Sequence, residues 1–161
     1  MPQSLAKILI HTVFSTKDRR PFLRDQPLRE EMHRYLGGIL ANQNCQPIII
    51  GGVEDHVHIL STLSRTCQAA EMIKEVKRGS SLWIKAKGPE LHDFAWQNGY
   101  GIFSIGHSQV DAVRKYIAGR RSTTAGFHFR MSCVNYYSDT KSNLTSGMTG
   151  IEATRSGLII C

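Results

Sequence analysis

The sequence lacks any closely spaced cysteine pair and contains no apolar run long enough to cross a membrane. Its cysteines are scattered with no CxxC spacing, which argues against a zinc site or a disulfide framework. The N-terminal residues lack the layout of a signal peptide. We therefore expect a cytoplasmic protein with no membrane partner. The four cysteines are Cys45, Cys67, Cys133 and Cys161.

Acidic residues are also in short supply. The 161 residues include 13 Asp and Glu against 20 Lys and Arg, which gives a formal net charge of +7. An excess of basic charge favours a polyanionic partner, because binding to phosphates releases counterions. Many basic proteins bind no nucleic acid, so charge alone leaves the partner open. The length suits one domain with a sizeable hydrophobic core.

The pattern of apolar residues predicts elements in the order β-α-β-β-α-β, followed by a third helix. This order is typical of an α+β fold, the ferredoxin-like split βαβ arrangement, whose antiparallel sheet has two helices on one face. The other face is then available to a flat ligand, to nucleic acid or to a second copy of the chain. On the second helix we expect one buried stripe, formed by Ala70, Ile73, Val76 and Leu82. The expected strands are 7–15, 45–53, 54–63 and 94–106, and the expected helices are 26–44, 67–87 and 108–119.

Two histidines stand out in the segment EDHVHILSTL at 54–63. Residues two apart on a strand point to the same face, so His56 and His58 can present their imidazoles to one point. Two convergent imidazoles suit a catalytic divalent metal ion that keeps positions for substrate oxygens. The preceding Glu54 and Asp55 can support the ligands from outside. An isolated His-x-His pattern is weak, and the alternative is a pair of histidines that make ordinary hydrogen bonds on a sheet face.

A basic chain with a catalytic divalent metal ion points to phosphoryl transfer on DNA. Such chemistry needs a nucleophile, either an activated water or a side chain. The expected helix 108–119 contains the candidate Tyr116, with Arg114, Lys115 and Arg120 nearby. A tyrosine hydroxyl can attack phosphorus and hold the product covalently. The alternative is that Tyr116 is a packing residue on an amphipathic helix.

Five segments together resemble the IS200/IS605 insertion-sequence family of transposases, which use a single tyrosine and a histidine-hydrophobe-histidine motif. The segments occur in the order and spacing of the family and cover residues from about 5 to 119. They are HTVFSTKDRRPFL at 11–23, EDHVHILSTL at 54–63, IKEVKRGSS at 73–81, WQNGYGIFSI at 96–105 and VRKYIAG at 113–119.

The resemblance implies an enzyme that cuts and rejoins single-stranded DNA at the ends of a mobile element. It implies that His56 and His58 hold Mg²⁺ or Mn²⁺, and that Tyr116 attacks the scissile phosphate to give a 5′-phosphotyrosyl link and a 3′-hydroxyl. That hydroxyl can reverse the attack, so no nucleotide cofactor is needed. Members of the family are homodimers that recognise DNA hairpins near the element ends. In such dimers the tyrosine helix can complete the site of the opposite subunit.

Basic residues in two segments are candidates for contacts with a DNA backbone. The alternative for each of them is a solvated surface charge. Trp96 and Tyr100 could stack on bases, although core packing is at least as well supported. The candidates for DNA binding are Lys17, Arg19, Arg20, Lys77 and Arg78.

The chain departs from the family after the tyrosine helix. The family pattern continues as Tyr-Ile-x-x-Gln, in which Gln is the third metal ligand, and then has a His-His pair. This chain has Arg120 at the Gln position and Thr123-Thr124 in place of the histidines. Arginine cannot ligate a cation. We therefore expect a single transposase domain at 1–119 and an atypical, poorly ordered tail at 120–161.

The genetic code offers an origin for this tail. Residues 120–133 can be encoded by bases that read differently when one C is restored before the first codon. The restored frame gives Gln-Glu-Glu-His-His-Arg-Arg-Val-Ser-Phe-Gln-Asp-Glu-Leu, which contains the missing Gln and histidine pair. The single codon of Met131 is compatible with this frame. We therefore hypothesise a one-base deletion near Gly119, and the alternative is a divergent, functional tail.

Two other functions remain open from the sequence. A chain without the third ligand could be a DNA-hairpin-binding remnant with impaired catalysis. It could also be a repeat-associated tyrosine transposase, which acts on repeated palindromes dispersed in a genome. A covalent link to DNA separates an active transposase from the remnant, and the genomic neighbourhood of the gene separates it from the repeat-associated relative.

Overall fold

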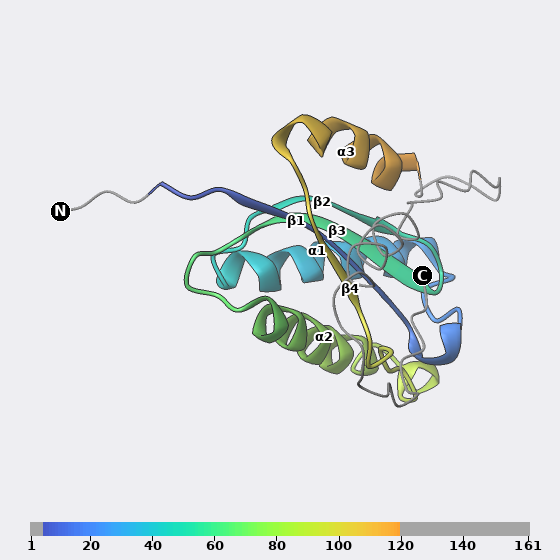
Figure 1. The fold of residues 1–161 in the computed structure, drawn as a ribbon. Coiled ribbons are helices and arrows are strands. Elements are labelled where there is room, and N and C mark those ends of the chain that lie inside the picture. The colour runs from blue at the N-terminus through green and yellow to red at the C-terminus, as the bar shows by residue number, and fades with distance from the viewer. Residues whose placement is uncertain (1–4, 120–161) are drawn as a thin grey trace, which may run out of the picture. The chain divides into compact units, whose positions relative to one another are not determined.

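A computed structural model describes residues 5–119 of the chain. Four antiparallel strands form one sheet in the order β2-β3-β1-β4 (Figure 1). This topology confirms the predicted α+β, split βαβ fold with an additional C-terminal helix. The strands are β1 (Ile8–Ser15), β2 (Pro47–Gly52), β3 (His56–Leu63) and β4 (Gly101–Ser104). The helices are α1 (Gln26–Asn42), α2 (Ala69–Lys85) and α3 (Val110–Gly119), with short 3-10 turns η1 (Lys17–Arg19), η2 (Pro89–Leu91) and η3 (His107–Gln109).

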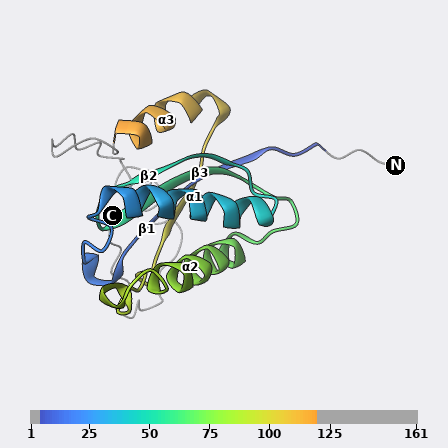
Figure 2. The same cartoon turned by 180° about the vertical axis from the view of Figure 1, so that it is seen from behind.

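The two faces of the sheet carry different helices. α1 and α2 cover one face of the sheet, and α3 lies on the other face. The same arrangement is seen from opposite sides in Figures 1 and 2. Alternation along β3 follows this division. Val57 and Ile59 are buried in the core beneath α1 and α2, whereas His56 and His58 point to the side of α3. The second face of the sheet, which we expected to be available to a ligand or partner, is therefore covered in part by α3.

α1 begins where the sequence caps it. The side chain of Asp25 accepts a hydrogen bond from the backbone N–H of Leu28 at 2.9 Å, which satisfies one of the unpaired donors of the first turn. Pro27 occupies this first turn, where its missing N–H costs nothing. The apolar residues that bury the helix against the sheet recur every four positions and are Met32, Leu36 and Leu40.

The buried face of α2 differs from the predicted stripe. Ile73 and Val76 are buried as expected, but Ala70 and Leu82 are exposed, Leu82 by 65%. Six residues after Val76 correspond to about 600° of rotation, which turns Leu82 away from the core. The other buried residues of this helix are Met72, Ser80 and Ile84.

The predicted strand 94–106 is shorter in the structure, because its aromatic entry belongs to the core. Phe94 and Trp96 are buried with ring centroids 4.9 Å apart, and Trp96 donates a hydrogen bond from Nε1 to Oγ of Ser80 at 2.8 Å. Of the two interpretations of Trp96, the structure supports core packing. Tyr100 is 43% exposed, so stacking on bases and packing against the core both stay open for this residue.

Within residues 5–119, no helix combines the length and the apolar composition that crossing a bilayer requires. The predictions for the tail lie outside the described residues. These are the poor order of 120–161, the frameshift, and the position of Arg120 at the place of the third ligand.

Candidate active site

The two predicted histidines converge at the start of β3. The ring centroids of His56 and His58 lie 5.1 Å apart, with the ring planes at 75°. His56 is partly exposed and His58 is buried. In the strand pairing, His58 stands opposite Val13 of β1 and Gly51 of β2. One strand thus places both imidazoles on the face that α3 covers, as the spacing predicts.

Asp55 holds His56 from outside the strand. Its Oδ1 lies 2.6 Å from Nδ1 of His56, and its Oδ2 accepts from Nε of Arg19 at 2.9 Å. Burial raises the pKa of Asp55, but the hydrogen bonds and charges of His56 and Arg19 outweigh it, so the pKa lies below its ordinary value of 3.8. Asp55 is therefore a carboxylate that can only accept. The hydrogen of a neutral His56 then sits on Nδ1, and its lone pair is on Nε2.

A strained turn after β1 brings Arg19 to Asp55. Asp18 and Arg19 adopt the left-handed backbone, with φ of 55° and 53°. This conformation costs roughly 1–2 kcal/mol for each residue that is not glycine. Thr16 holds the turn, because its hydroxyl donates to the carbonyl of Arg20 at 2.7 Å and its N–H donates to the carbonyl of Asp55 at 2.8 Å. The turn is thus anchored to the residue that holds His56.

A third histidine, which sequence reasoning missed, lies beside the pair. His11 of β1 is fully buried, and its Nε2 is 3.1 Å from Nδ1 of His58. The two rings stack with centroids 5.3 Å apart and an angle of 22°. Burial lowers the pKa of His11 to about 4, so the ring is neutral near pH 7. The sequence held two signals, since His11 opens the segment 11–23 that resembles the family, and β1 and β3 are neighbours in a split βαβ sheet.

Tyr116 of α3 faces the same histidines. Its ring centroid lies 5.3 Å from that of His58, with the planes at 88°, and 6.3 Å from that of His11. The neighbouring Ile117 is fully buried against β2, where Gly51 leaves room for it. A Cβ on Gly51 would lie 2.8 Å from both Cγ2 and the carbonyl oxygen of Ile117. The structure therefore brings together His56, His58 and Tyr116, the three residues predicted to form the catalytic site.

The donor set fits a divalent metal ion in part. His56 and His58 each have Nδ1 engaged by a neighbour, an arrangement typical of histidines that ligate through Nε2. Among residues 5–119, no group of three or more His, Cys, Asp or Glu side chains is placed to hold a metal ion. Two protein nitrogens therefore need completion by further oxygen ligands. The expected third position, Arg120, lies outside this range.

The DNA-binding candidates fall in two places, the turn after β1 and helix α2. Arg19 lies next to the histidines through its ion pair with Asp55. Lys17 and Arg20 are exposed in the same turn, and the guanidinium of Arg20 lies 4.4 Å from the ring centroid of Phe22. Their contact with DNA stays a prediction.

Lys77 and Arg78 lie on α2, on the face away from the histidines. The ammonium of Lys77 donates to the carbonyls of Gln97 at 2.7 Å and Gly99 at 2.8 Å, and burial lowers its pKa to about 8. Arg78 pairs with Glu75 on the exposed side of the helix at 3.2 Å. Lys77 thus holds the segment that leads into β4, and a DNA contact of either residue stays a prediction.

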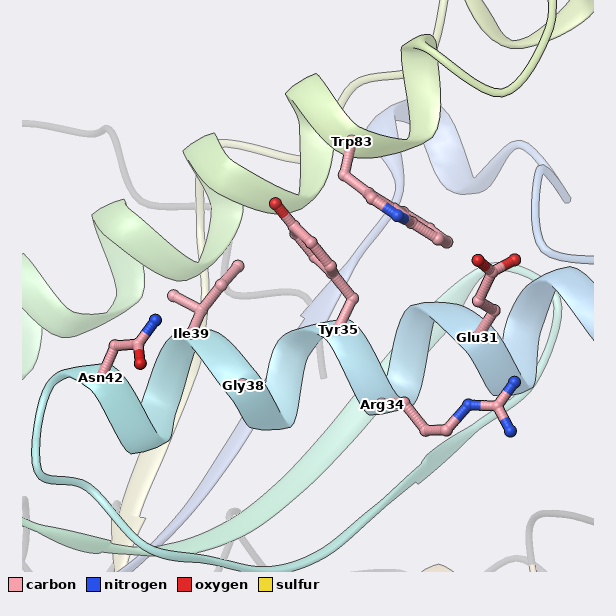
Figure 3. A pocket seen from close by; sticks show the side chains of 7 residues that line it. All are labelled: Glu31, Arg34, Tyr35, Gly38, Ile39, Asn42 and Trp83. Atoms are coloured by element: carbon pink, nitrogen blue, oxygen red, sulfur yellow. The ribbon is translucent and has the colours of Figure 1, made fainter.

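A hollow on the outer surface of the two core helices is separate from this site. Figure 3 shows Tyr35 of α1 beside Trp83 of α2, and their rings stack with centroids 5.0 Å apart. Lys87 lies 4.7 Å from the ring centroid of Trp83 and pairs with Glu31. These contacts join the middle of α1 to the C-terminal end of α2, on the side away from α3.

Most of the chain matches one family of known proteins. The family described as "Transposase IS200 like" matches residues 4–120. The chain belongs to the IS200-like transposase family. The part matched to the IS200-like transposases contains both histidines of β3 and the tyrosine of α3, so the segments identified in the sequence and the family match coincide.

Two solved structures are similar to this IS200-like chain. A Deinococcus radiodurans R1 protein named as a transposase is 17% identical with a TM-score of 0.59, over 76% of this chain and 98% of that chain. A REP-associated tyrosine transposase bound to a REP hairpin is 13% identical with a TM-score of 0.50, over 73% of this chain and 67% of that chain. At these identities the likeness shows a shared fold. No curated protein matches the sequence.

Proposed function

We propose that this IS200-like transposase cleaves and rejoins single-stranded DNA through a covalent bond to Tyr116. The observation that carries the proposal is the meeting of three rings within one chain: the rings of His56 and His58 lie 5.1 Å apart, and the ring of Tyr116 lies 5.3 Å from that of His58. A phenol beside two imidazoles is a nucleophile next to groups that can hold a divalent cation.

The proposed reaction is a transesterification at phosphorus. The Oη of Tyr116 forms a bond to the scissile phosphorus, and the bond from phosphorus to the 3′-oxygen breaks. The phenolic proton leaves to solvent, and the departing oxygen gains one to become a 3′-hydroxyl. Because one phosphodiester replaces another, the 3′-hydroxyl can later attack the 5′-phosphotyrosine and release the tyrosine. No nucleotide cofactor is consumed in either direction.

His56 and His58 are the residues that would hold Mg²⁺ or Mn²⁺. Such an ion, when bound, supplies Lewis-acid stabilisation of the charge that develops on the phosphate. Asp55 fixes the ring of His56 and keeps its hydrogen on Nδ1. Gly51 lets α3 lie close to β2 and so keeps Tyr116 near His58.

The substrate we propose is single-stranded DNA with a hairpin near the ends of a mobile element. A similar structure, the REP-associated transposase, is bound to a REP hairpin. The net charge of +7 supports a phosphate-rich partner. We further propose a homodimer that works in the cytoplasm. The residues proposed to contact the DNA are Lys17, Arg19, Arg20, Lys77 and Arg78.

A second function, that of a hairpin-binding remnant, is favoured by one observation. Arg120 stands where the resemblance implies a glutamine ligand, and a guanidinium repels a cation. Domain 1–119 with the substituted tail 120–161 would then bind DNA and cleave it poorly. Under the frameshift hypothesis, the tail 120–161 has replaced the native residues, and this replacement causes the impaired cleavage.

Covalent trapping tests both functions. The chain as it stands and a version with the one-base frame restored are incubated with Mn²⁺ and labelled single strands from both flanks of the gene. We expect a protein–DNA adduct on a denaturing gel that is lost in Tyr116→Phe and kept in Tyr100→Phe. An adduct only with the restored frame supports the remnant for this chain. No adduct with either version contradicts the proposed chemistry.

A further inference from the structure

The burial of His11 has no explanation in stability. The side chain is fully buried on the α3 side of the sheet, beside His58, Tyr116 and Phe103. Its Nε2 is bonded to His58, whereas its Nδ1 has no hydrogen-bond partner among residues 5–119. A buried polar nitrogen that makes no hydrogen bond costs about 1–3 kcal/mol. An apolar residue at this place would avoid that cost, but it would also remove the contact with Nδ1 of His58.

The contact has two possible directions, because one hydrogen lies between two ring nitrogens. If His11 donates from Nε2, a neutral His58 carries its own hydrogen on Nε2 and cannot ligate a metal ion through that atom. If His58 donates from Nδ1, its lone pair is on Nε2. The second direction requires only that His11 is neutral with its hydrogen on Nδ1.

The neighbouring histidine shows the same arrangement. Nδ1 of His56 lies 2.6 Å from a carboxylate oxygen of Asp55, an obligatory acceptor. Asp55 precedes β3 and His11 comes from β1, so different parts of the chain engage the Nδ1 atoms of the two rings. A hydrogen bond from Nδ1 to an outer acceptor fixes the tautomer and orientation of a metal-ligating histidine.

We propose that His11 is a positioning residue for the metal site: its Nε2 accepts a hydrogen bond from Nδ1 of His58 and thereby keeps the ligating lone pair of His58 on Nε2. The proposal rests on the proposed function in that it takes His58 as a ligand. It assigns His11 no contact with the metal ion or with DNA.

Three variants separate positioning from a general effect on folding. His11→Leu fills the space without an acceptor, and His11→Gln returns an oxygen near the place of Nε2. Thr12→Val changes another buried polar residue of β1 whose side chain faces the core helices and has no hydrogen bond within residues 5–119. We expect His11→Leu to weaken Mn²⁺ binding by about 10- to 100-fold. We expect His11→Gln to recover most of this loss and Thr12→Val to bind like the original chain.

The deciding measurement needs neither metal nor DNA. Long-range proton–nitrogen NMR of the metal-free full chain at pH 7.5 reports which ring nitrogen of His58 carries hydrogen. We expect Nδ1–H in the original chain and in His11→Gln, and a shift toward Nε2–H in His11→Leu. Nε2–H in the original chain overturns the proposal, and this result stands even if His11→Leu does not fold. The same tautomer and the same Mn²⁺ affinity in folded His11→Leu also overturn it.

The Mn²⁺ titration, followed by electron paramagnetic resonance, tests the proposed function separately. If the original chain and its Arg120→Gln variant both fail to bind Mn²⁺, the metal site of the proposed function is contradicted. The NMR measurement still shows separately whether His11 sets the tautomer of His58.

Discussion

At the scale of single residues, the two histidines of β3 differ in the kind of neighbour that holds them. His56 is held by a carboxylate whose other oxygen is paired with Arg19, and His58 is held by a neutral imidazole. A charged acceptor makes a ligand more basic than a neutral one does. We therefore expect the two rings to contribute unequally to a metal site, with His56 the stronger ligand.

Removal of the charged acceptor tests this difference. Asp55→Ala should weaken Mn²⁺ binding by about 10- to 100-fold, because His56 loses the group that orients it. Glu54→Ala is the matched control, since Glu54 pairs only with Arg24 in the described contacts, at 3.4 Å on an exposed surface. Equal Mn²⁺ affinities of the two variants, measured by paramagnetic resonance, would contradict the role of Asp55.

The buried His11 makes the fold sensitive to acid. Its pKa is about 4 in the folded chain and near 6.5 in the unfolded chain, so the unfolded state binds more protons between these values. The contribution of His11 to the free energy of unfolding is therefore at its maximum above pH 6.5, and it falls as the pH drops toward 4. At about 1.4 kcal/mol for each pH unit between the two pKa values, the loss reaches at most about 3–4 kcal/mol.

Urea unfolding of the metal-free chain at several pH values measures this loss. His58 and Tyr116 are the titratable groups whose rings contact His11, so the His11→Gln variant is needed to isolate its contribution. The difference in stability between the original chain and this variant should change between pH 6.5 and 4. A difference that is constant across this range contradicts the assignment.

The sequence predicted part of the site because strand geometry is local. The period of two along β3 puts His56 and His58 on one face whatever the rest of the chain does. His11 could not be found in this way, because its approach to His58, 47 residues further along the chain, depends on the register of β1 against β3. Register follows from the assembled core rather than from either strand alone.

At the scale of elements, the contact of α3 with β2 positions the nucleophile. The helix can lie close to the sheet because Gly51 has no side chain where Ile117 packs. The adjacent Tyr116 is thereby held near His58. The sequence placed the tyrosine on a helix, but it did not indicate which strand that helix would cover.

Gly51→Ala should displace this helix. The added methyl group would meet Ile117 at 2.8 Å, so α3 must move outward. We expect a loss of about 1–3 kcal/mol in the free energy of unfolding, as for an overpacked core, and at least a tenfold slower formation of the DNA adduct. Gly38→Ala in α1 is the control, because a Cβ there meets nothing within 4 Å. It should leave the adduct unchanged and stabilise the helix, and an equal effect of both changes contradicts the role of Gly51.

The element-scale predictions succeeded where the periodic pattern was strong and failed where it was mixed. The helices 26–44 and 67–87 were predicted to within a few residues of α1 and α2. Leu82 was assigned to the buried face because it is apolar, although its spacing from Val76 turns it away from the core. Phe94 and Trp96 were assigned to a strand because aromatic residues favour strands and cores alike.

At the scale of the whole molecule, the histidines and the tyrosine meet within one chain. The resemblance to the family allows the tyrosine helix to complete the site of the opposite subunit, but Tyr116 lies beside His58 of its own chain. Mixing His56→Ala chains with Tyr116→Phe chains should therefore form no more adduct than either alone. Recovery of adduct in the mixture would show that a partner supplies the tyrosine.

Peptide mapping of the trapped adduct tests the proposed tyrosine chemistry most directly. Trypsin cleaves after Lys115 and Arg120, so Tyr116 is the only tyrosine of the peptide 116–120. In the frame-restored chain, the peptide that begins at Tyr116 continues past position 120 and again contains no other tyrosine. With Mn²⁺ and single-stranded DNA from the gene's flanks, we expect the nucleotide mass on Tyr116 in whichever version forms the adduct. A nucleotide on any other residue, or no adduct in either version, would contradict a tyrosine nucleophile beside His56 and His58.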